Sequence, residues 1–353
     1  MKCLIKNVSI QAIATYLPTN TLDMISLVDL FDEKSIKTVM NATGVNRVHV
    51  ADADQTASDM CFEAAKFLIE KEEIDKEEID GLVFISQTAD YRAPATSIIL
   101  QDRLGLSKET VCFDINYGCS GYIYGIFQAA NLIGSGACKK VLVLAGDTTT
   151  KMINPKDRSQ RMVFGDAGSA SIVSKGEGQI GFHICSDGSD YDKVIVPAGG
   201  FRIPSTELTR KENIDADGNI RTDENLYMDG SSVFHFIIKQ GQKSVKTLLQ
   251  YMGWDKDDVN FYAMHQATRF TLSYLRKRLK IDNETMPINI SNYGNTGPTT
   301  IPLVLTDLCH TNIKTKKWNK VIMCAYGIGL SWGSIACDLT RTNIYKPINK
   351  ISN

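Results

Sequence analysis

The stretch DINYGCSG (residues 114–121) holds a cysteine between glycines at the end of an apolar run. A closely similar stretch, NYGNTG (residues 292–297), returns later in the chain with Asn295 at the position of Cys119. In both stretches the glycines permit a sharp turn after a predicted strand and a close approach by another molecule. This repetition suggests that the chain is built from two related halves.

Three further segments of the first half recur in the same order in the second half. GLVFISQ (81–87) is similar to NFYAMHQ (260–266), KKVLVLAG (139–146) to NKVIMCAY (319–326), and GSASIV (168–173) to GSIAC (333–337). Together with the glycine turns, these matches in register indicate a duplicated module. Short β-branched runs alternate with helical patterns, so each half is predicted as strand, helix, strand, glycine turn, helix, strand, strand.

The duplication predicts two structural units, residues 1–176 and residues 177–353. We expect the halves to pack as layered sheets with helices between and outside them. The strand ends that carry the two glycine turns would then converge on one crevice, where open α/β sheets tend to bind ligands. Residues 187–229 interrupt the pattern with glycine, proline and polar residues. We interpret them as an inserted cap over the site, and a long surface loop is the alternative.

Composition indicates a large globular protein without a broad charged surface. Of the 353 residues, 43% are hydrophobic, and the net charge of −1 favours neither nucleic acid nor a membrane as partner. No apolar stretch reaches the ~20 residues that span a bilayer, and Lys6 and Asn7 interrupt the region where a secretory signal would be apolar. The nine cysteines form no C-x-x-C pair, which favours free thiols in a reducing cytoplasm over disulfides or a zinc site.

Cys119 is the cysteine best placed for chemistry. It follows a predicted strand and precedes a predicted helix over residues 121–133. Its thiol is therefore expected to meet the positive end of the helix dipole and unpaired backbone N–H groups, both of which stabilise a thiolate. The other cysteines are expected to be buried core residues: Cys3, Cys61, Cys112, Cys138, Cys185, Cys309, Cys324 and Cys337.

A nucleophilic cysteine needs partners, and two residues at related positions in the second half are candidates. His265 ends a predicted apolar strand and precedes a predicted helix. Asn295 lies in the turn that mirrors the turn of Cys119. The remaining histidines lack such surroundings and are expected to be structural or at the surface: His49, His183, His235 and His310.

These residues belong to a set of ordered motifs that resembles the β-ketoacyl-acyl-carrier-protein synthase III family of the thiolase superfamily. The motifs are TGVNR (43–47), GCSG (118–121), DR (157–158), FGDAG (164–168), MDG (228–230), HQA (265–267), GNT (294–296) and GIGLSWG (327–333). Each is weak alone, but in this order they are highly specific. The resemblance implies a thiolase-like α/β fold of two βαβαβαββ halves in a five-layer αβαβα arrangement, and a homodimer.

The resemblance also implies a condensing enzyme, an acyltransferase of fatty acid biosynthesis that works without a metal or redox cofactor. Cys119 would take an acyl group from a thioester, while backbone N–H groups of Cys119 and Ile328 bind the oxyanion. Malonyl-acyl carrier protein would then lose carbon dioxide, with His265 and Asn295 stabilising the enolate that attacks the acyl-cysteine. The alternative is an acyltransferase of a specialised pathway that moves the acyl group to an oxygen, nitrogen or non-malonyl carbon acceptor.

Departures from the family pattern concern the substrate. Thr38 and Ala42 stand where family members commonly carry the tryptophan and arginine that sandwich the adenine of coenzyme A, whereas Arg158 is retained near the nucleotide position. The acyl donor is therefore expected to be a carrier protein or another thioester rather than simply acetyl-coenzyme A. Ala93 stands where an often larger residue closes the partner's acyl pocket, which predicts a roomier pocket.

Basic residues cluster after His265: Arg269, Arg276, Lys277, Arg278 and Lys280. On a helix, Arg269, Arg276 and Lys280 fall near one face. A solvated helix is one interpretation. The family resemblance implies the other, a docking surface for an acidic acyl carrier protein.

Overall fold

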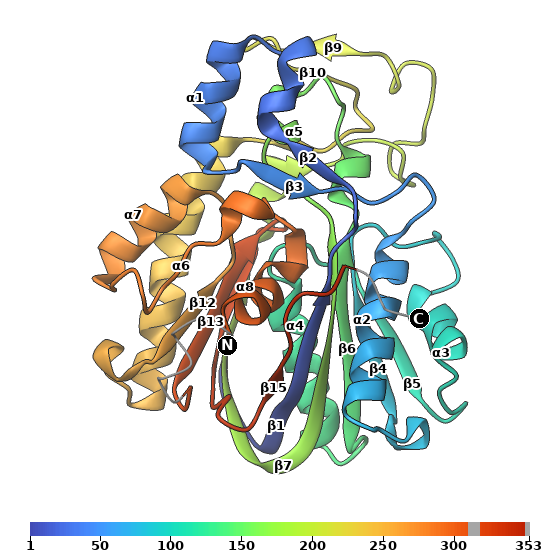
Figure 1. Cartoon of the computed structure of the whole chain (residues 1–353), viewed down its shortest axis with the longest axis vertical. Coiled ribbons are helices and arrows are strands. Elements are labelled where there is room, and N and C mark those ends of the chain that lie inside the picture. The colour runs from blue at the N-terminus through green and yellow to red at the C-terminus, as the bar shows by residue number, and fades with distance from the viewer. Residues whose placement is uncertain (310–317, 350–353) are drawn as a thin grey trace.

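The structure is a computed structural model that describes residues 1–309 and 318–349 (Figure 1). His310 lies outside the described residues. The described α-helices are α1 (Glu33–Thr43), α2 (Ala57–Lys71), α3 (Thr96–Leu104), α4 (Gly121–Gly134), α5 (Arg158–Arg161), α6 (Gly230–Met252), α7 (Arg269–Leu279) and α8 (Thr300–Leu308). The main strands are β1 (Lys2–Tyr16), β4 (Gly81–Ile85), β5 (Val111–Ile115), β6 (Lys140–Asp147), β7 (Ala167–Ser186), β12 (Phe261–Met264), β13 (Val321–Gly327) and β14 (Ser331–Cys337). Short strands are β2 (Thr21–Asp23), β3 (Arg47–His49), β8 (Val194–Ile195), β9 (Asn213–Ile214), β10 (Ile220–Arg221), β11 (Tyr227–Met228) and β15 (Asn343–Ile344).

One sheet runs through the molecule in the order β12-β13-β14-β7-β6-β4-β5, with β1 also paired to β7. The long strand β7 pairs with β6 along residues 167–174 and with β14 along residues 181–186. β7 therefore belongs to both halves of the sheet and joins them, and β1 follows it along most of its length (Figure 1). The predicted boundary between residues 176 and 177 lies where β7 changes partners, and the division into two units remains a prediction.

Helices form three layers around the two halves of the sheet. α2 and α3 cover the outer face of the β4–β6 half, where Leu68 and Phe84 are fully or almost fully buried. α6 and α7 cover the outer face of the β12–β14 half, around Leu248 and Tyr262. α4 and α8 lie between the halves and share one buried core with strands of both (Figure 1). The order helix, sheet, helix, sheet, helix is the predicted five-layer arrangement.

The two halves repeat one order of elements, with one difference from the prediction. The elements of the first half follow the order α2-β4-α3-β5-α4-β6-β7, and the corresponding elements of the second half follow the order α6-β12-α7-α8-β13-β14. β4 pairs in parallel with β6, which pairs antiparallel with β7. In the same way, β12 pairs in parallel with β13, which pairs antiparallel with β14. The strand predicted before the glycine turn of the second half is not formed, since residues 287–291 contain no strand. The Asn289 N–H donates to the side chain of Gln266 instead of to a neighbouring strand.

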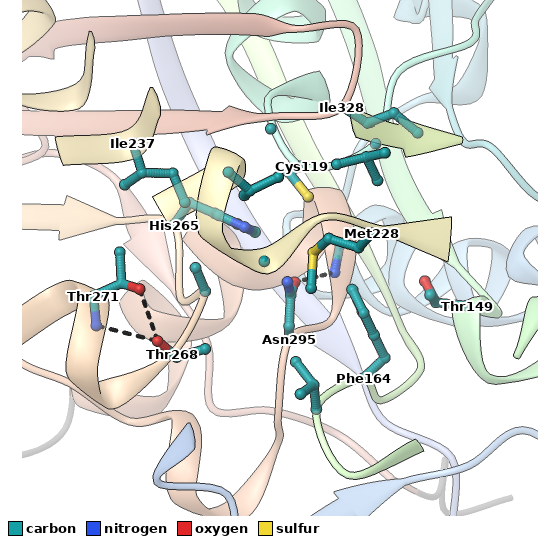
Figure 2. A pocket seen from close by; sticks show the side chains of 18 of the residues that line it. Cys119, Thr149, Phe164, Met228, Ile237, His265, Thr268, Thr271, Asn295 and Ile328 are labelled. Atoms are coloured by element: carbon teal, nitrogen blue, oxygen red, sulfur yellow. Dashed lines mark hydrogen bonds between the residues drawn. The ribbon is translucent and has the colours of Figure 1, made fainter. Parts of the chain in front are cut away.

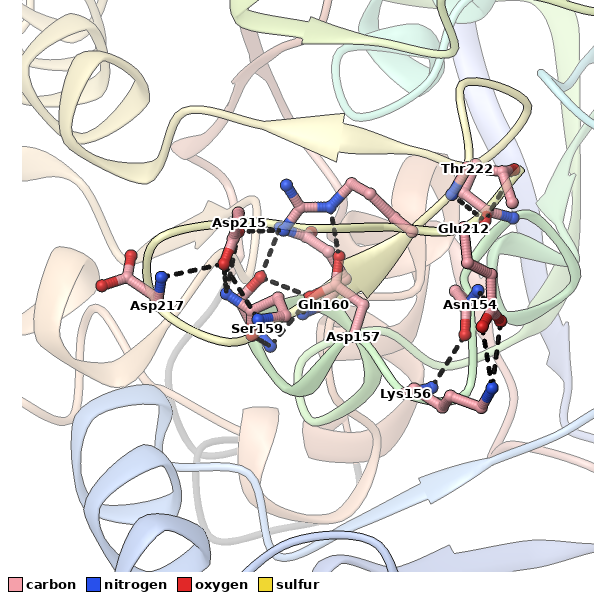
Figure 3. A network of polar contacts seen from close by, with 12 residues as sticks. Asn154, Lys156, Asp157, Ser159, Gln160, Glu212, Asp215, Asp217 and Thr222 are labelled. Atoms are coloured by element: carbon pink, nitrogen blue, oxygen red, sulfur yellow. Dashed lines mark hydrogen bonds and ion pairs between the residues drawn. The ribbon is translucent and has the colours of Figure 1, made fainter. Parts of the chain in front are cut away.

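A polar network fastens the interrupting segment 187–229 to the rest of the molecule (Figure 3). The buried carboxylate of Asp157 accepts hydrogen bonds from the N–H groups of Ser159 and Gln160 at the start of α5. Arg221 on β10 donates to Asp157 at 2.8 Å and to Asp215 at 2.8 Å. Because the charge of Asp157 is both paired and hydrogen-bonded, its burial is compensated. The β9–β10 hairpin is thereby held against α5.

Candidate active site

A cavity of about 370 Å³ lies where the two halves of the sheet meet, and Cys119, His265 and Asn295 all line it (Figure 2). Figure 2 shows their side chains directed toward the same space. The structure therefore brings together the three residues that the sequence singled out as catalytic. Much of the remaining wall is apolar and includes Met152, Val163, Phe164, Val194, Leu226, Met228, Val233, Phe234, Ile237 and Phe270. Val194, Leu226 and Met228 belong to the segment 187–229, which was predicted to cap the site.

Glycines allow the turn of Cys119 to approach the β13–β14 turn. β5 ends at Ile115 and α4 begins at Gly121, so Cys119 lies in the connection between them. A Cβ added to Gly327 would lie 2.9 Å from the Cys119 sulfur, so a larger residue there would collide with it. A hydrogen bond of 2.7 Å between the hydroxyls of Ser120 and Ser331 joins the two turns. Together these contacts place Ile328 beside the cysteine.

The Cys119 thiol is protonated in the resting site. Burial raises its pKa to about 12, and the carboxylate of Asp147 contributes in the same direction. The N–H groups of Ile328 and Cys119 and the side chain of Asn295 lower the pKa only part of the way back. Desolvation of the charge thus outweighs the nearby donors, so these surroundings favour the thiol over the thiolate that was expected at the start of α4.

His265 follows the last residue of β12 and is almost completely buried. Its backbone N–H donates to the carbonyl of Cys324 at 2.8 Å, and its ring packs edge-on against Tyr326. Nδ1 of the ring lies 2.6 Å from the hydroxyl oxygen of Thr300. Burial lowers the pKa of His265 to about 3, so the imidazole is neutral at neutral pH.

Hydrogen bonds within its own turn orient the Asn295 side chain. Its Oδ1 accepts from the N–H of Gly297 at 3.0 Å, which assigns Nδ2 as the atom that faces the cavity. The backbone N–H of Asn295 donates to the Val163 carbonyl at 2.8 Å. Gly294 and Gly297 adopt φ values of 65° and 58°, which other residues rarely adopt. The turn therefore depends on both glycines and presents an uncharged donor.

Asp147 is a site residue that sequence reasoning missed. It ends the apolar strand β6, lines the cavity and is only 2% exposed. Its Oδ1 accepts hydrogen bonds from the Ser86 hydroxyl at 2.8 Å and from the Gln87 N–H at 2.7 Å. Burial nevertheless raises the pKa of Asp147 to about 6. The sequence feature that could have identified Asp147 is its position as an aspartate at the end of an otherwise apolar strand.

Asp147 is expected to control the pH dependence of Cys119 alkylation. Above pH 6 the carboxylate is charged and opposes a thiolate, so Asp147→Asn should lower the Cys119 pKa by about one unit. Iodoacetamide should then modify the variant about tenfold faster than the wild type between pH 7 and pH 10, as measured by mass spectrometry of the Cys119 peptide. Below pH 6 the two rates should converge because the wild-type carboxyl is protonated. Identical rates above pH 6 would contradict this role.

The residues predicted to bind substrate do not all reach the cavity. Ala42 lines it, whereas Thr38 is exposed on α1 and its hydroxyl donates to the Lys34 carbonyl. Arg158 donates to the Ser35 hydroxyl at 3.1 Å and to the Asp217 carbonyl at 3.2 Å. Ala93 lines a separate surface pocket and does not contribute to this cavity.

Most of the predicted docking residues are exposed on or beside α7. Arg269, Lys277, Arg278 and Lys280 are exposed and Arg276 is half-buried. Arg269 and Arg276 also donate to the backbone carbonyls of Gly44 and Met286, at 3.1 Å and 3.3 Å. Lys280 lies just beyond the end of α7 in a left-handed conformation, so it does not continue the predicted helical face.

Two negative findings concern the described ranges, residues 1–309 and 318–349. Within them, no helix combines the length and apolar character needed to cross a membrane. The same ranges contain no group of three or more His, Cys, Asp or Glu side chains arranged to hold a metal ion.

Comparison with known proteins identifies relatives along most of the chain. Profiles of 3-oxoacyl-[acyl-carrier-protein] synthase III and of its C-terminal domain match residues 113–188 and 249–339. A β-ketoacyl-[acyl-carrier-protein] synthase III of Caldanaerobacter subterraneus is 32% identical over 326 residues, covering 91% of this chain and 94% of the relative. The crystal structure of a 3-oxoacyl-(acyl-carrier protein) synthase from Burkholderia xenovorans LB400 superposes with a TM-score of 0.92 at 35% identity, covering 99% of each chain.

The duplicated fold and the cavity between its halves define a thiolase-like condensing enzyme of the acyltransferase type. Sequence identity across more than nine-tenths of the chain gives its particular family. The chain belongs to the β-ketoacyl-acyl-carrier-protein synthase III family of fatty acid biosynthesis.

Proposed function

We propose that this condensing enzyme loads an acyl group onto Cys119 and joins it to the carbon that malonyl-acyl carrier protein exposes on losing carbon dioxide. One observation carries the assignment of roles: a thiol and two uncharged side-chain groups, His265 and Asn295, face a single largely apolar cavity. Neutral donors in such a site stabilise developing negative charge without themselves titrating. The product is a β-ketoacyl-acyl carrier protein.

In the loading step, the Cys119 sulfur attacks the carbonyl carbon of the acyl thioester. The N–H groups of Cys119 and Ile328, which already point toward the sulfur, bind the oxyanion of the tetrahedral intermediate. The donor thiolate then leaves and takes up the proton that Cys119 loses. Because burial raises the pKa of Cys119, the thiol has to give up its proton during loading, and water carries that proton to the departing donor thiolate.

In the condensing step, the bond from the malonyl α-carbon to the carboxylate breaks and its electron pair passes into an enolate. The His265 Nε2–H and the Asn295 amide donate to the enolate oxygen. The α-carbon attacks the Cys119 thioester, a carbon–carbon bond forms, and the Cys119 thiolate leaves and takes a proton from water. No metal or redox cofactor is needed in this scheme, since every bond change occurs between substrate and Cys119.

The acyl donor is proposed to be a carrier protein in preference to coenzyme A. Arg158 is held between Ser35 and the β9–β10 hairpin, and the carboxylate of Asp32 lies close enough to interact with its charge. Two of the five N–H donors of this guanidinium are therefore engaged within the protein, and its charge is partly balanced by Asp32. Thr38 and Ala42 supply no ring or cation for adenine.

The acyl group is proposed to be longer than acetyl. Met152, Leu226 and Met228 extend the apolar wall, and a cavity of about 370 Å³ has room for more than a two-carbon chain beside a pantetheine arm. Apolar walls favour the burial of each added methylene by ~0.8 kcal/mol. The proposed contribution of Ala93 to the partner's pocket stays a prediction.

Two surfaces are proposed for partners. Exposed Arg269 and Lys277 lie on α7, whose first turn also provides Phe270 at the cavity. An acidic carrier protein docked there would deliver its pantetheine arm directly into the cavity.

The second surface is the edge strand β5, where Val111 and Phe113 are each 37% exposed, which suits pairing with a second copy of the chain. We place this homodimer in the cytoplasm, since buried thiols such as Cys61 and Cys324 are free.

Acyl loading measured on Cys119 tests the function and the donor together. Acetyl, butyryl, hexanoyl and branched acyl groups are offered on carrier protein, on coenzyme A and on pantetheine, and the mass added to the Cys119 peptide is followed with time. We expect acyl groups on carrier protein to load Cys119 at least about tenfold faster than the same groups on coenzyme A. The loading rate from coenzyme A should equal the rate from pantetheine within about threefold. Malonyl-acyl carrier protein added next should give the β-keto product.

Each failure of this experiment has a separate meaning. Absence of an adduct with any donor would end the nucleophile assignment. Adducts that never condense with malonyl-acyl carrier protein would favour transfer to another acceptor. Loading from coenzyme A that is far faster than from pantetheine would contradict the proposed lack of an adenine site.

A further inference from the structure

The hydroxyl of Thr300 is the only hydrogen-bonding partner that the described structure gives to the His265 ring. Thr300 opens α8 and is almost completely buried, and its Oγ1 lies 2.6 Å from Nδ1. The His265 ring is neutral, so it carries one N–H and one unprotonated nitrogen. Whichever partner supplies the proton in the Thr300 contact therefore decides whether Nε2 faces the cavity as a donor or as an acceptor.

The surrounding hydrogen bonds indicate that Thr300 is the donor. Its hydroxyl could alternatively donate to the Gly297 carbonyl at 3.2 Å, but that carbonyl already accepts the backbone N–H of Thr300. The hydroxyl proton is thus not required there. At 2.6 Å, the contact of the hydroxyl with Nδ1 is also shorter than its 3.2 Å contact with the Gly297 carbonyl, which favours Nδ1 as the acceptor of the hydroxyl proton.

We propose that Thr300 is a positioning residue that fixes His265 as the tautomer with its proton on Nε2. The role of that proton in catalysis rests on the proposed condensation. The same turn orients the other donor, because the Gly297 N–H occupies Oδ1 of Asn295 and leaves Nδ2 for the cavity. Residues 295–300 therefore direct two neutral donors at one point, where the enolate oxygen forms.

This tautomer separates the two halves of the reaction. An Nε2 that carries a proton cannot accept the proton of Cys119, so His265 is not the base for loading. In this proposal the Nε2–H of His265 donates to the enolate oxygen instead. Loss of the Thr300 hydroxyl should therefore slow condensation much more than loading.

The tautomer of His265 is measured directly with ¹⁵N-histidine-labelled protein, without substrate. Histidine is present at only five positions, and a His265→Ala variant assigns the resonance. We expect a protonated Nε2 and an unprotonated Nδ1 in the wild type and in Thr300→Ser, and a mixture in Thr300→Val. A wild-type ring protonated on Nδ1 would overturn the proposal, whatever the variants do.

Kinetics of the same variants test the consequence. Thr300→Val should lower the condensation rate about 10–100-fold and change Cys119 loading by less than about threefold, and Thr300→Ser should recover condensation. Thr306→Val is the matched control, since Thr306 lies on the same helix and its hydroxyl bonds to that of Thr15 at 2.8 Å, away from His265. It should cost similar stability without altering the tautomer.

The outcomes distinguish this proposal from the function on which it rests. Equal losses of loading and condensation in Thr300→Val, or a tautomer shift in Thr306→Val, would show a merely structural role. If the wild type fails to condense at all, the proposed function fails, while the ¹⁵N spectrum still decides the role of Thr300. Should Thr300→Val not fold, Thr300→Ala gives the same comparison with a smaller side chain.

Discussion

Replacing Cys119 with alanine is expected to abolish acyl loading and to lower condensation by at least about 10³-fold, because the acyl group then has no atom to which it can be attached. The measurement is the mass of the peptide that contains residue 119 after incubation with acyl-carrier protein, together with the rate of β-keto product formation. The cavity should keep its shape, since alanine is smaller than cysteine and Gly327 already allows close contact.

Cys185→Ala is the matched control for this variant. Cys185 also lies beside a histidine, with its sulfur 3.3 Å from Nε2 of His183, but it does not line the cavity. A cysteine–histidine contact alone therefore does not define the site. We expect loading and condensation to stay within about twofold of the wild type. Adduct formation that follows Cys185 instead of Cys119 would refute the assignment of the nucleophile.

The second large effect is expected when either His265 or Asn295, the two proposed donors to the enolate oxygen, is replaced. His265→Ala and Asn295→Ala should each lower condensation about 10²–10³-fold, the range found when one oxyanion donor is removed. Loading on Cys119 should fall less than about fivefold, because its oxyanion is bound by backbone N–H groups. Rapid-quench measurement of acyl-Cys119, followed by single-turnover condensation, separates the two steps.

Asn295→Asp sharpens this test. The substitution keeps the shape of the side chain but replaces a neutral donor with a group that is negatively charged when ionised, so condensation should fall further than in Asn295→Ala at pH 8. His235→Ala is the control for loss of an imidazole, since His235 is exposed and bonds only to the Ser231 carbonyl of its own helix in the described structure. Equal effects of the alanine substitutions on loading and condensation would contradict the division of roles.

Local patterns in the sequence were sufficient to predict the duplicated fold. Strand and helix periodicity, and the repetition of NYGCSG as NYGNTG, depend on residues close together in the chain. The same patterns put Cys119, His265 and Asn295 at strand ends or in the turns after them, and the architecture then required these positions to converge. The strand predicted before the glycine turn of the second half is not formed, because a hydrogen bond from Asn289 to the distant Gln266 side chain replaces a ladder there.

The sequence by itself thus determined the fold, the family and the identity of the three residues that meet in the cavity, because these follow from short-range periodicity and ordered motifs. Only the tertiary structure decided their chemical state. Burial, supplied by elements far apart in the chain, raises the pKa of Cys119 where the helix start alone predicted a thiolate, and keeps His265 neutral. The roles of Asp147 and Thr300 likewise emerge only from three-dimensional contacts, since desolvation and hydrogen-bond partners depend on distances that sequence spacing does not give.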